Sequence, residues 1–290
     1  MKKIIILMPV YNDWESLTKL LQTIDLTIKD FKNYSFECLV INDSSILKQP
    51  VLKKPISFNT FSIIDMKKNC GHARCIATGL RYINLNKNYD YVIIMDSDGE
   101  DRPCEMVDLI NKIGKEPKIS VVAKRIKRSE GFVFQSLYQI HKFITFFFTG
   151  KNINFGNYSC LTNKDSFKIS NDASLWSSFS GTLKKNIQDL NEIDSIRGQR
   201  YYGPSKMSIF NLIIHSFSII GVFKYYVFLR SAILVLILMM LSNFVGIFGN
   251  VLMIILIIFN LAIFAVSLRE KKRLLTQSEK NIANINEIIH

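Results

Sequence analysis

The chain has 290 residues, of which 48% are hydrophobic, and its 37 lysines and arginines against 24 acidic residues give a formal charge of +13. A positive mean hydropathy of +0.16 does not fit a soluble nucleic-acid-binding protein, and 12% aromatic residues do not fit a disordered basic one. The five cysteines form no C-x-x-C pair, which excludes a zinc ribbon and a disulfide-stapled secreted scaffold. Association with a membrane accounts for both the charge and the hydropathy.

Short apolar runs alternate with helical patterns over the first 125 residues. Strands are predicted at 4–8, 37–41, 60–64, 91–95 and 119–123, and helices at 14–24, 73–83 and 104–113. This alternation predicts an α/β fold in which helices cover both faces of a mostly parallel sheet. From residue 132 the pattern is helical to 149, and it is then irregular to about 203.

The segment 207–223 is apolar except for a few polar residues that recur every three or four positions. They include Ser208, Asn211, His215 and Ser218. This spacing places them on one stripe of a helix whose remaining surface is apolar. An amphipathic helix in the plane of a membrane surface fits the pattern; a core helix of the globular domain is the alternative, because periodicity does not distinguish a lipid from a protein partner.

Residues 231–268 contain no aspartate, glutamate, lysine or arginine, and Gly249 and Asn250 divide this run near its middle. Two helices of about 19 and 18 residues would each span roughly 27–29 Å, close to the thickness of the hydrocarbon layer. We therefore expect a transmembrane hairpin, with a buried helix pair of a soluble core as the alternative. Basic residues flank the run on both sides, so the positive-inside rule predicts that both flanks are cytoplasmic.

These patterns divide the chain into four parts. We expect a cytoplasmic α/β domain at 1–203, an interfacial helix at 204–225, two transmembrane helices within 226–268 (about 229–248 and 251–268), and a cytoplasmic tail at 269–290 with a short helix. The protein would thus be a multi-pass protein of the plasma membrane with both termini in the cytoplasm.

Acidic residues follow three of the predicted strands. The segments are 9–13 (PVYND), 42–45 (NDSS) and 96–101 (DSDGED). The carboxyl ends of parallel strands meet at one edge of a sheet, which is where ligands of such sheets bind. Asp96 and Asp98 would repel each other unless a cation lay between them, and Mg²⁺ or Mn²⁺ shared with a nucleotide diphosphate suits this arrangement.

Together these segments resemble the family 2 glycosyltransferases of GT-A fold. Further along, Asn69 and Gly71, the 200–207 stretch (RYYGPSKM) and the paired apolar helices resemble the subgroup of polyprenyl-phosphate glycosyltransferases akin to dolichol-phosphate mannose synthase. The resemblance extends over the chain to about Arg273.

The resemblance implies roles for residues of the acidic segments. The residues expected to line the nucleotide-sugar pocket are Pro9, Tyr11, Asp13, Asp43 and Asp96, and those expected to hold the metal are Asp96, Asp98 and Glu100. Glu100 stands where relatives carry Gln, and Asp13 replaces the commoner Glu. Relatives often carry an Asp where this chain has Asn157, so Asn157 is left out of the catalytic set, which is Asp96, Asp98 and Arg200.

The acceptor expected from the resemblance is a polyprenyl phosphate, which is already ionised at neutral pH and needs positioning cations rather than a general base. The candidate acceptor-phosphate residues are Arg125, Arg128, Arg200, Ser205 and Lys206. The competing interpretation is that these are juxtamembrane charges attracted to anionic lipid.

We therefore expect a metal-dependent, membrane-anchored inverting glycosyltransferase that moves a sugar from a UDP- or GDP-sugar to a polyprenyl phosphate. The alternatives are transfer to a hydroxyl of a lipid-linked or surface glycan, and a non-catalytic membrane scaffold on the same fold. The expected partners are the nucleotide sugar, the lipid and the bilayer; self-association is left open, and no nucleic acid is expected.

Overall fold

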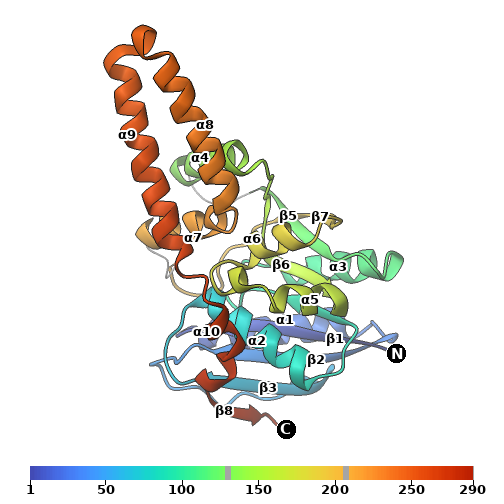
Figure 1. Ribbon diagram of the computed structural model, residues 1–290. Helices are drawn as coiled ribbons and strands as arrows, with labels where there is room; N and C mark the ends of the chain where they lie inside the picture. The colour runs from blue at the N-terminus through green and yellow to red at the C-terminus, as the bar shows by residue number, and fades with distance from the viewer. Residues whose placement is uncertain (128–131, 205–208, 290) are drawn as a thin grey trace.

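The computed structural model describes residues 1–127, 132–204 and 209–289. Its centre is an eight-stranded sheet with the strand order β7-β5-β6-β4-β1-β2-β3-β8 (Figure 1). The strands are β1 (Lys2–Val10), β2 (Tyr34–Asn42), β3 (Phe58–Met66), β4 (Tyr91–Ile94), β5 (Val121–Lys127), β6 (Phe155–Thr162), β7 (Asn191–Ile196) and β8 (Ile282–Glu287). Strands β1 to β5 fall where apolar runs predict them, although β5 begins two residues later.

Helices cover both faces of this sheet, so the predicted α/β fold class is confirmed. One buried cluster packs α1 (Trp14–Ile28) and α3 (Pro103–Lys115) against the sheet, and a second packs α2 (His72–Asn86) against the other face. The second face also carries α5 (Asn163–Ser170), the 3₁₀ helix η1 (Ala173–Trp176) and α6 (Phe179–Asn186). The central strands are buried on both sides, which explains their unbroken apolar runs.

The sheet is parallel at its centre and mixed at its margins. Strand β1 pairs in parallel with β2 and β4, β2 with β3, and β5 with β7, whereas β6 runs antiparallel between β4 and β5. Strand β8 is antiparallel to β3 at the far edge.

Two segments contain strands where the sequence pattern predicted none. The stretch expected to be irregular to about 203 contains β6 and β7, and the tail contains β8 in addition to α10 (Lys272–Thr276) and the 3₁₀ helix η2 (Ser278–Asn281). Strands β7 and β8 lie at the two edges, where half of the β7 residues and most of the β8 residues are exposed, so neither has the apolar run by which a buried strand is recognised. Hence the tail belongs to the sheet rather than being a separate piece.

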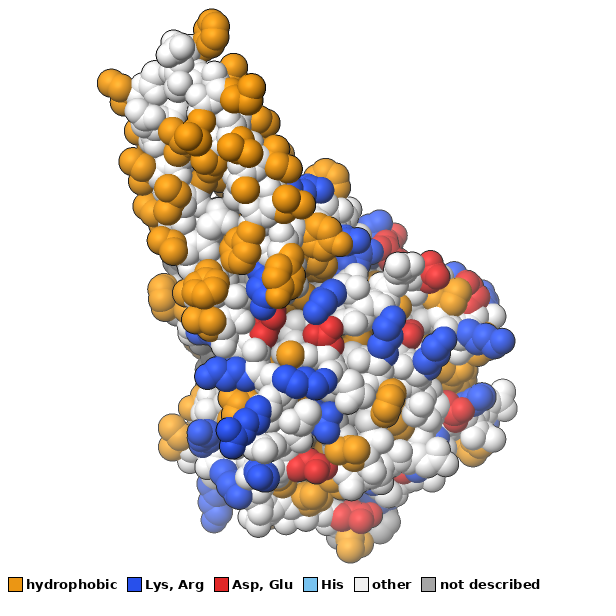
Figure 2. All heavy atoms as spheres, in the orientation of Figure 1, with side chains coloured by type: hydrophobic (Ala, Val, Ile, Leu, Met, Phe, Trp, Pro, Cys, Tyr) orange, Lys and Arg blue, Asp and Glu red, His pale blue; other side chains and the backbone are white. Residues whose placement is uncertain are grey.

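A helical hairpin projects from the domain (Figure 1). Helix α8 (Lys224–Met240) leads away from the domain and α9 (Ser242–Ser267) returns to it, while α4 (Phe132–Thr149) and α7 (Ile209–Gly221) lie at its base. Hydrophobic side chains cover the projecting part, and lysines and arginines gather at and below its base (Figure 2).

The turn of this hairpin lies earlier than the sequence indicated. We expected the first helix to run to about 248, but α8 ends at Met240, and α9 has a break at Gly246, where φ is +52°. Gly249 and Asn250 lie inside α9, because an isolated glycine in an apolar helix does not by itself end the helix. The helix expected over 204–225 is described from Ile209 to Gly221.

Candidate active site

The loops that follow β1 and β2 interlock at the carboxyl edge of the sheet. Asn12 and Ser44 both have positive φ, which turns the chain sharply after each strand. The side-chain oxygen of Asn12 accepts hydrogen bonds from the amides of Ile46 and Leu47 at 2.8 and 3.0 Å. This contact holds the PVYND and NDSS segments against each other.

Asp43 ties the end of β2 to the start of α2. Its carboxylate accepts hydrogen bonds from the backbone amides of Cys70 and Gly71 at 2.6 and 2.8 Å, and the side chain is buried. These amides lie immediately before the helix, where amide groups lack acceptors within the helix itself. Asp43 therefore shapes the loop beside the candidate donor pocket.

The DSDGED turn after β4 concentrates four carboxylates. Asp101 accepts a hydrogen bond from the amide of Asp96 at 2.9 Å, and Asp98 accepts one from the amide of Glu100 at 3.0 Å. Burial together with the charges of Asp96 and Glu100 raises the pKa of Asp98 to about 6, and burial together with Asp96 raises the pKa of Asp101 to about 7. The turn thus carries more negative charge than its surroundings easily accommodate.

Arg200 joins two of the acidic segments. Its guanidinium pairs with Asp98 at 2.7 Å and also with Asp13, and all three side chains are mostly buried. The same segment places Arg197 against the carboxylate of Glu100 and donates the amide of Gly198 to the Glu100 carbonyl at 2.8 Å. The 197–202 segment therefore lies directly on the acidic turn.

Gly99 allows this segment to approach closely. Its φ is +90°, and a Cβ atom there would lie 2.7 Å from the ring of Tyr201. The amide of Tyr201 donates to the carbonyl of Asp98 at 2.9 Å, and Lys19 lies 4.7 Å from the centre of the Tyr201 ring. A larger residue than glycine would push Tyr201 off the turn.

His72 and Asn157 are the partners of Asp96. The Nε2 atom of His72 lies 3.1 Å from an Asp96 carboxylate oxygen, and the amide of Asn157 donates to the same oxygen at 3.2 Å. Burial lowers the pKa of His72, but Asp96, Asp98 and Asp101 outweigh this effect and hold that pKa above its ordinary value. The neighbouring carboxylates therefore favour the protonated form of His72.

The carboxylates expected to hold a metal each have a cationic partner from the protein. Over residues 1–127, 132–204 and 209–289, no three His, Cys, Asp or Glu side chains converge on a point that could hold a metal ion. Mg²⁺ uses one or two carboxylates together with substrate phosphates and water, so it does not need such a group. Asp98, whose raised pKa indicates excess negative charge, and the neighbouring Asp96 would together suit an ion that the nucleotide completes.

The remaining candidate residues lie in different surroundings. Pro9 is buried within β1, and Tyr11 is half-buried just after it. Arg125 lies beside Gly156, where its charge favours the ionised form of Asp96 and opposes the rise in the pKa of Asp101. Arg128, Ser205 and Lys206 lie outside the described residues.

Sequence reasoning missed several residues that contact the acidic edge. Arg197 directly follows β7 and Tyr201 comes shortly after it, but the sequence pattern did not predict that strand, and His72 was not among the candidate residues. The basic-aromatic composition of 197–202 (RGQRYY), immediately before the apolar region, is the one sequence signal that could have indicated a segment facing carboxylates.

One helical segment, Ser242–Thr276, is long and apolar enough to cross a membrane. A second span exists if Phe210–Gly221 and Lys224–Met240, which meet at 88°, are counted as one. Both statements concern the described part of the chain only, and they rest on length and composition.

The sheet, its two helical layers and the acidic carboxyl edge define a glycosyltransferase of the GT-A type. Residues 5–178 match the profile described as glycosyl transferase family 2, and the chain belongs to this family.

A curated relative is the undecaprenyl-phosphate 4-deoxy-4-formamido-L-arabinose transferase of Serratia proteamaculans (strain 568). It is 24% identical over 219 residues, which make up 73% of this chain and 65% of that protein. The match thus spans slightly less than two thirds of the relative.

Among solved structures, the chain resembles glucosyl-3-phosphoglycerate synthase from Mycobacterium tuberculosis. The complex of that enzyme with Mn²⁺, UDP-glucose and phosphoglyceric acid gives a TM-score of 0.55 at 12% identity, covering 78% of this chain and 80% of the other. Its complex with Mn²⁺, UDP and phosphoglyceric acid gives 0.51 at 11% identity, covering 78% of each chain. Similarity at these identities shows the shared fold.

Proposed function

We propose that this chain is a membrane-anchored inverting glycosyltransferase that moves a sugar from a UDP- or GDP-sugar to a polyprenyl phosphate. The observation that carries the proposal is the position of the acidic edge beside the base of the apolar hairpin. His72 contacts Asp96 and also lines a cavity with His215 of α7 and Arg269, which follows α9. A donor at the acidic edge and an acceptor held in lipid would meet there. The Serratia relative, named for undecaprenyl phosphate, supports this acceptor class.

The donor would bind along the loops after β1, β2 and β4. Tyr11, Asp13 and Asp43, with Pro9 behind them, would line the nucleoside pocket, and Asp96 and Asp98 would hold Mg²⁺ or Mn²⁺, with Glu100 beside them. The ion supplies positive charge against the departing diphosphate. The mycobacterial complexes with Mn²⁺ and UDP support this ion and this type of nucleotide.

The reaction needs no general base. An oxygen of the lipid phosphate forms a bond to the anomeric carbon, the bond from that carbon to the nucleotide's β-phosphate oxygen breaks on the opposite face, and its electron pair leaves with the nucleoside diphosphate. A hydroxyl acceptor would have to lose a proton, whereas a phosphate monoester is already ionised. Asn157, next to Asp96, carries an amide that cannot accept this proton. These features favour the phosphate acceptor over a hydroxyl.

The cations proposed to bind the acceptor phosphate differ in whether they are already paired with carboxylates. Arg200 is paired with Asp13 and Asp98, so it would have to exchange a carboxylate for a phosphate oxygen when it binds either substrate. Arg125 lies beside Gly156, where its charge acts on Asp96. Arg128, Ser205 and Lys206 complete the proposed set.

The hairpin would anchor the enzyme in the plasma membrane with the catalytic domain in the cytoplasm. Strand β8 pairs with β3, so the tail that follows α9 lies on the same side of the hairpin as the catalytic domain. The basic residues at the base of the hairpin fit a cytoplasmic position.

The test is incubation of the purified full chain with labelled UDP- and GDP-sugars, undecaprenyl phosphate and Mg²⁺ or Mn²⁺. The expected result is metal-dependent transfer of label to the lipid from one donor. Binding of UDP or GDP without transfer from any donor would contradict the proposed acceptor, and the absence of nucleotide binding by calorimetry would favour the scaffold interpretation.

A further inference from the structure

A cavity of about 160 Å³ lies between the catalytic domain and the base of the hairpin. The first turn of α2 and the end of η1 form one wall, α7 forms another, and Arg269 reaches it from the end of α9. This volume exceeds the space that one water molecule requires by roughly tenfold, so a phosphate group fits. The cavity therefore lies where a soluble domain meets segments that would contact lipid.

Two arginines give this cavity a permanent positive charge. Arg74 and Arg269 both line it, no carboxylate does, and within the described residues neither arginine makes an ion pair. The guanidinium of Arg74 lies 5.9 Å from the centre of the Trp176 ring and donates one hydrogen bond to the Cys70 carbonyl at 2.6 Å. A guanidinium carries five N–H groups, so the Arg74 side chain has further donors that are suited to an anion.

The two guanidiniums also act on each other. Burial and the positive charge of Arg269 lower the pKa of Arg74, and the carboxylate of Asp43 opposes this effect only in part. Placing two like charges at one cavity is unfavourable unless an anion compensates them. A phosphate is suited to this role, because its oxygens match the N–H groups of a guanidinium.

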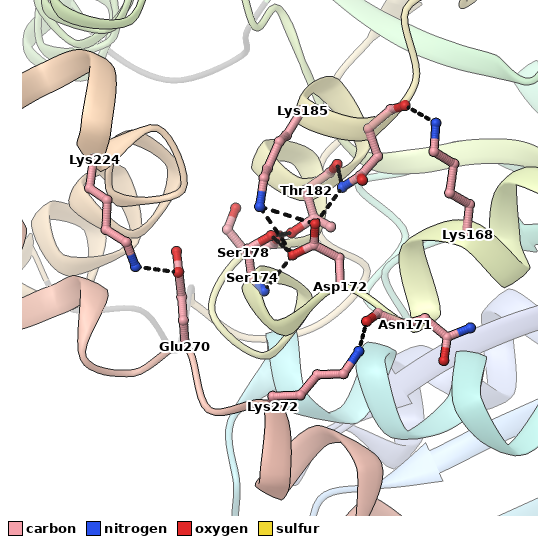
Figure 3. A network of polar contacts seen from close by, with 11 residues as sticks. Lys168, Asn171, Asp172, Ser174, Ser178, Thr182, Lys185, Lys224, Glu270 and Lys272 are labelled. Atoms are coloured by element: carbon pink, nitrogen blue, oxygen red, sulfur yellow. Dashed lines mark hydrogen bonds and ion pairs between the residues drawn. The ribbon is translucent and has the colours of Figure 1, made fainter.

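The residues that follow Arg269 make contacts that fix the chain at the base of the hairpin (Figure 3). Glu270 forms an ion pair with Lys224 at 2.7 Å, and Lys272 donates a hydrogen bond to the carbonyl of Asn171. Arg269 is thus followed by two contacts, one to the start of α8 and one to the catalytic domain. A site arranged in advance loses less conformational freedom on binding.

The cavity adjoins both the acidic edge and the apolar surface. His72 lines it and lies 3.1 Å from Asp96, so a bound anion would be one side chain away from the DSD carboxylates. On the other side Ile214 of α7 lines the cavity, and the same helix exposes Phe210 and Ile213. A ligand with a phosphate head and a hydrocarbon tail matches this combination.

We propose that Arg74 and Arg269 form the binding site for the phosphate head group of the lipid acceptor, in the cavity between α2, η1 and α7. This inference rests on the proposed function for the identity of the lipid. It adds two residues to the acceptor site that the strand-end and 200–207 motifs do not contain. Because Arg200 is already paired with two carboxylates, the cavity arginines supply the charge that the acceptor needs.

The experiment measures binding and turnover separately, using the full chain in detergent or nanodiscs. Direct binding of farnesyl phosphate and of inorganic phosphate is measured for the natural protein and for Arg74→Ala, Arg269→Gln and Lys271→Gln. Lys271 is the matched control, because it is an exposed cation two positions after Arg269 and is not among the residues that line the cavity. It carries the same charge as Arg269 in the same segment, so it reports general attraction to anionic surfaces.

We expect farnesyl phosphate to bind the natural protein, and each arginine variant to weaken that binding by about 10-fold or more, as for the loss of a charge-assisted hydrogen bond. The KM for undecaprenyl phosphate should rise in parallel, while the Kd for UDP or GDP with Mn²⁺ stays within about twofold. Arg269 is exposed, so its replacement leaves no buried cavity, and a melting curve checks folding for both variants.

Three results would overturn the inference: unchanged farnesyl phosphate binding in both arginine variants, an equal loss in Lys271→Gln, or equal affinity for inorganic phosphate, which would mark a site for free anions. Farnesyl phosphate binding that depends on both arginines, without sugar transfer from any donor, would support the site and contradict the proposed function. Sugar transfer to the lipid that is insensitive to both substitutions would support the proposed function and contradict this acceptor site.

Discussion

Arg200 is the residue that connects the acidic segments, because it pairs with Asp13 after β1 and with Asp98 after β4. These side chains are only 12% and 15% exposed, so each carboxylate depends on the shared guanidinium for compensation of its charge. Burial and the neighbouring carboxylates still raise the pKa of Asp98 to about 6, which indicates an excess of negative charge that a divalent cation would offset.

Replacing Asp98 by Asn should weaken the binding of UDP or GDP by about 10-fold or more when Mn²⁺ is present, because one proposed metal ligand is lost. Calorimetry with and without Mn²⁺ measures this effect, which should be much smaller without the ion. Asp108→Asn, at an exposed position on α3, is the control and should leave the affinity unchanged. Equal affinities for the natural protein and Asp98→Asn would remove Asp98 from the metal site.

Replacing Gly99 by Ala should lower both stability and activity, because the new Cβ would meet the Tyr201 ring in a backbone conformation that disfavours side chains. The expected loss of stability is about 1–3 kcal/mol. Gly203→Ala is a matched control, since Gly203 also has positive φ but nothing lies within 4 Å of the added atom. Thermal melting should show a smaller loss for Gly203→Ala, and equal losses would mean that the Tyr201 contact does not matter.

At the scale of elements, the 3₁₀ helix η1 connects the catalytic domain to the cavity wall. Asp172 caps it by accepting hydrogen bonds from the amide and hydroxyl of Ser174 at 2.9 and 2.6 Å, and it also pairs with Lys185 at 3.0 Å (Figure 3). Trp176, at the other end of η1, lies against Arg74. The Asp172 cap therefore supports the wall on which Arg74 rests.

The contribution of Asp172 should depend on pH. Burial raises its pKa, but hydrogen bonds from Ser174 and Asn186 and the contact with Lys185 outweigh burial and lower the pKa from 3.8 to about 2. A lowered folded-state pKa means that the stabilisation is present above pH 3.8 and is lost as the pH falls towards 2.

Asp172→Asn should therefore lower the free energy of unfolding by about 1–2 kcal/mol at pH 7, and the difference from the natural protein should shrink below about pH 4. Melting temperatures between pH 7 and pH 3 measure this difference. Asp189→Asn, an exposed position in the following loop, is the control and should show no such dependence. A difference that stays constant over this range would contradict a charge-based role for Asp172.

At the scale of the whole molecule, the hairpin is an insertion between the catalytic domain and the strand that completes its sheet. The chain leaves the domain at α8, returns at α9 and ends as β8 on the edge of the same sheet (Figure 1). If the hairpin crosses a bilayer, its tip and the tail must lie on opposite sides.

Cysteine labelling in intact cells tests this arrangement. In a Cys104→Ser background, which removes the exposed natural thiol, a membrane-impermeant maleimide should label Ser242→Cys at the tip from outside. Ala283→Cys, an exposed position of β8, should react only after the cells are opened. Labelling of both positions under the same condition would show that the hairpin does not cross the membrane.

Much of the fold follows from patterns that the sequence carries locally. Strand β4 and most of β1 are unbroken apolar runs because both faces of the sheet are covered there, and α1 to α3 have one apolar stripe each. Strands β7 and β8 could not be recognised because these edge strands bury few of their side chains and therefore carry no apolar run. The hairpin turn was misplaced because many positions in an apolar helix permit a turn equally well.

The sequence by itself determined the α/β class, the acidic carboxyl edge and the charge-free run, since each depends on which residues are adjacent or periodic along the chain. The tertiary structure decided which charges meet: Arg200 reaches Asp13 across 187 positions, and Arg74 and Arg269 come to one cavity from α2 and from the end of α9. Electrostatic and hydrogen-bonding partners act through space, so their pairing depends on how the strands and helices pack rather than on any spacing in the sequence.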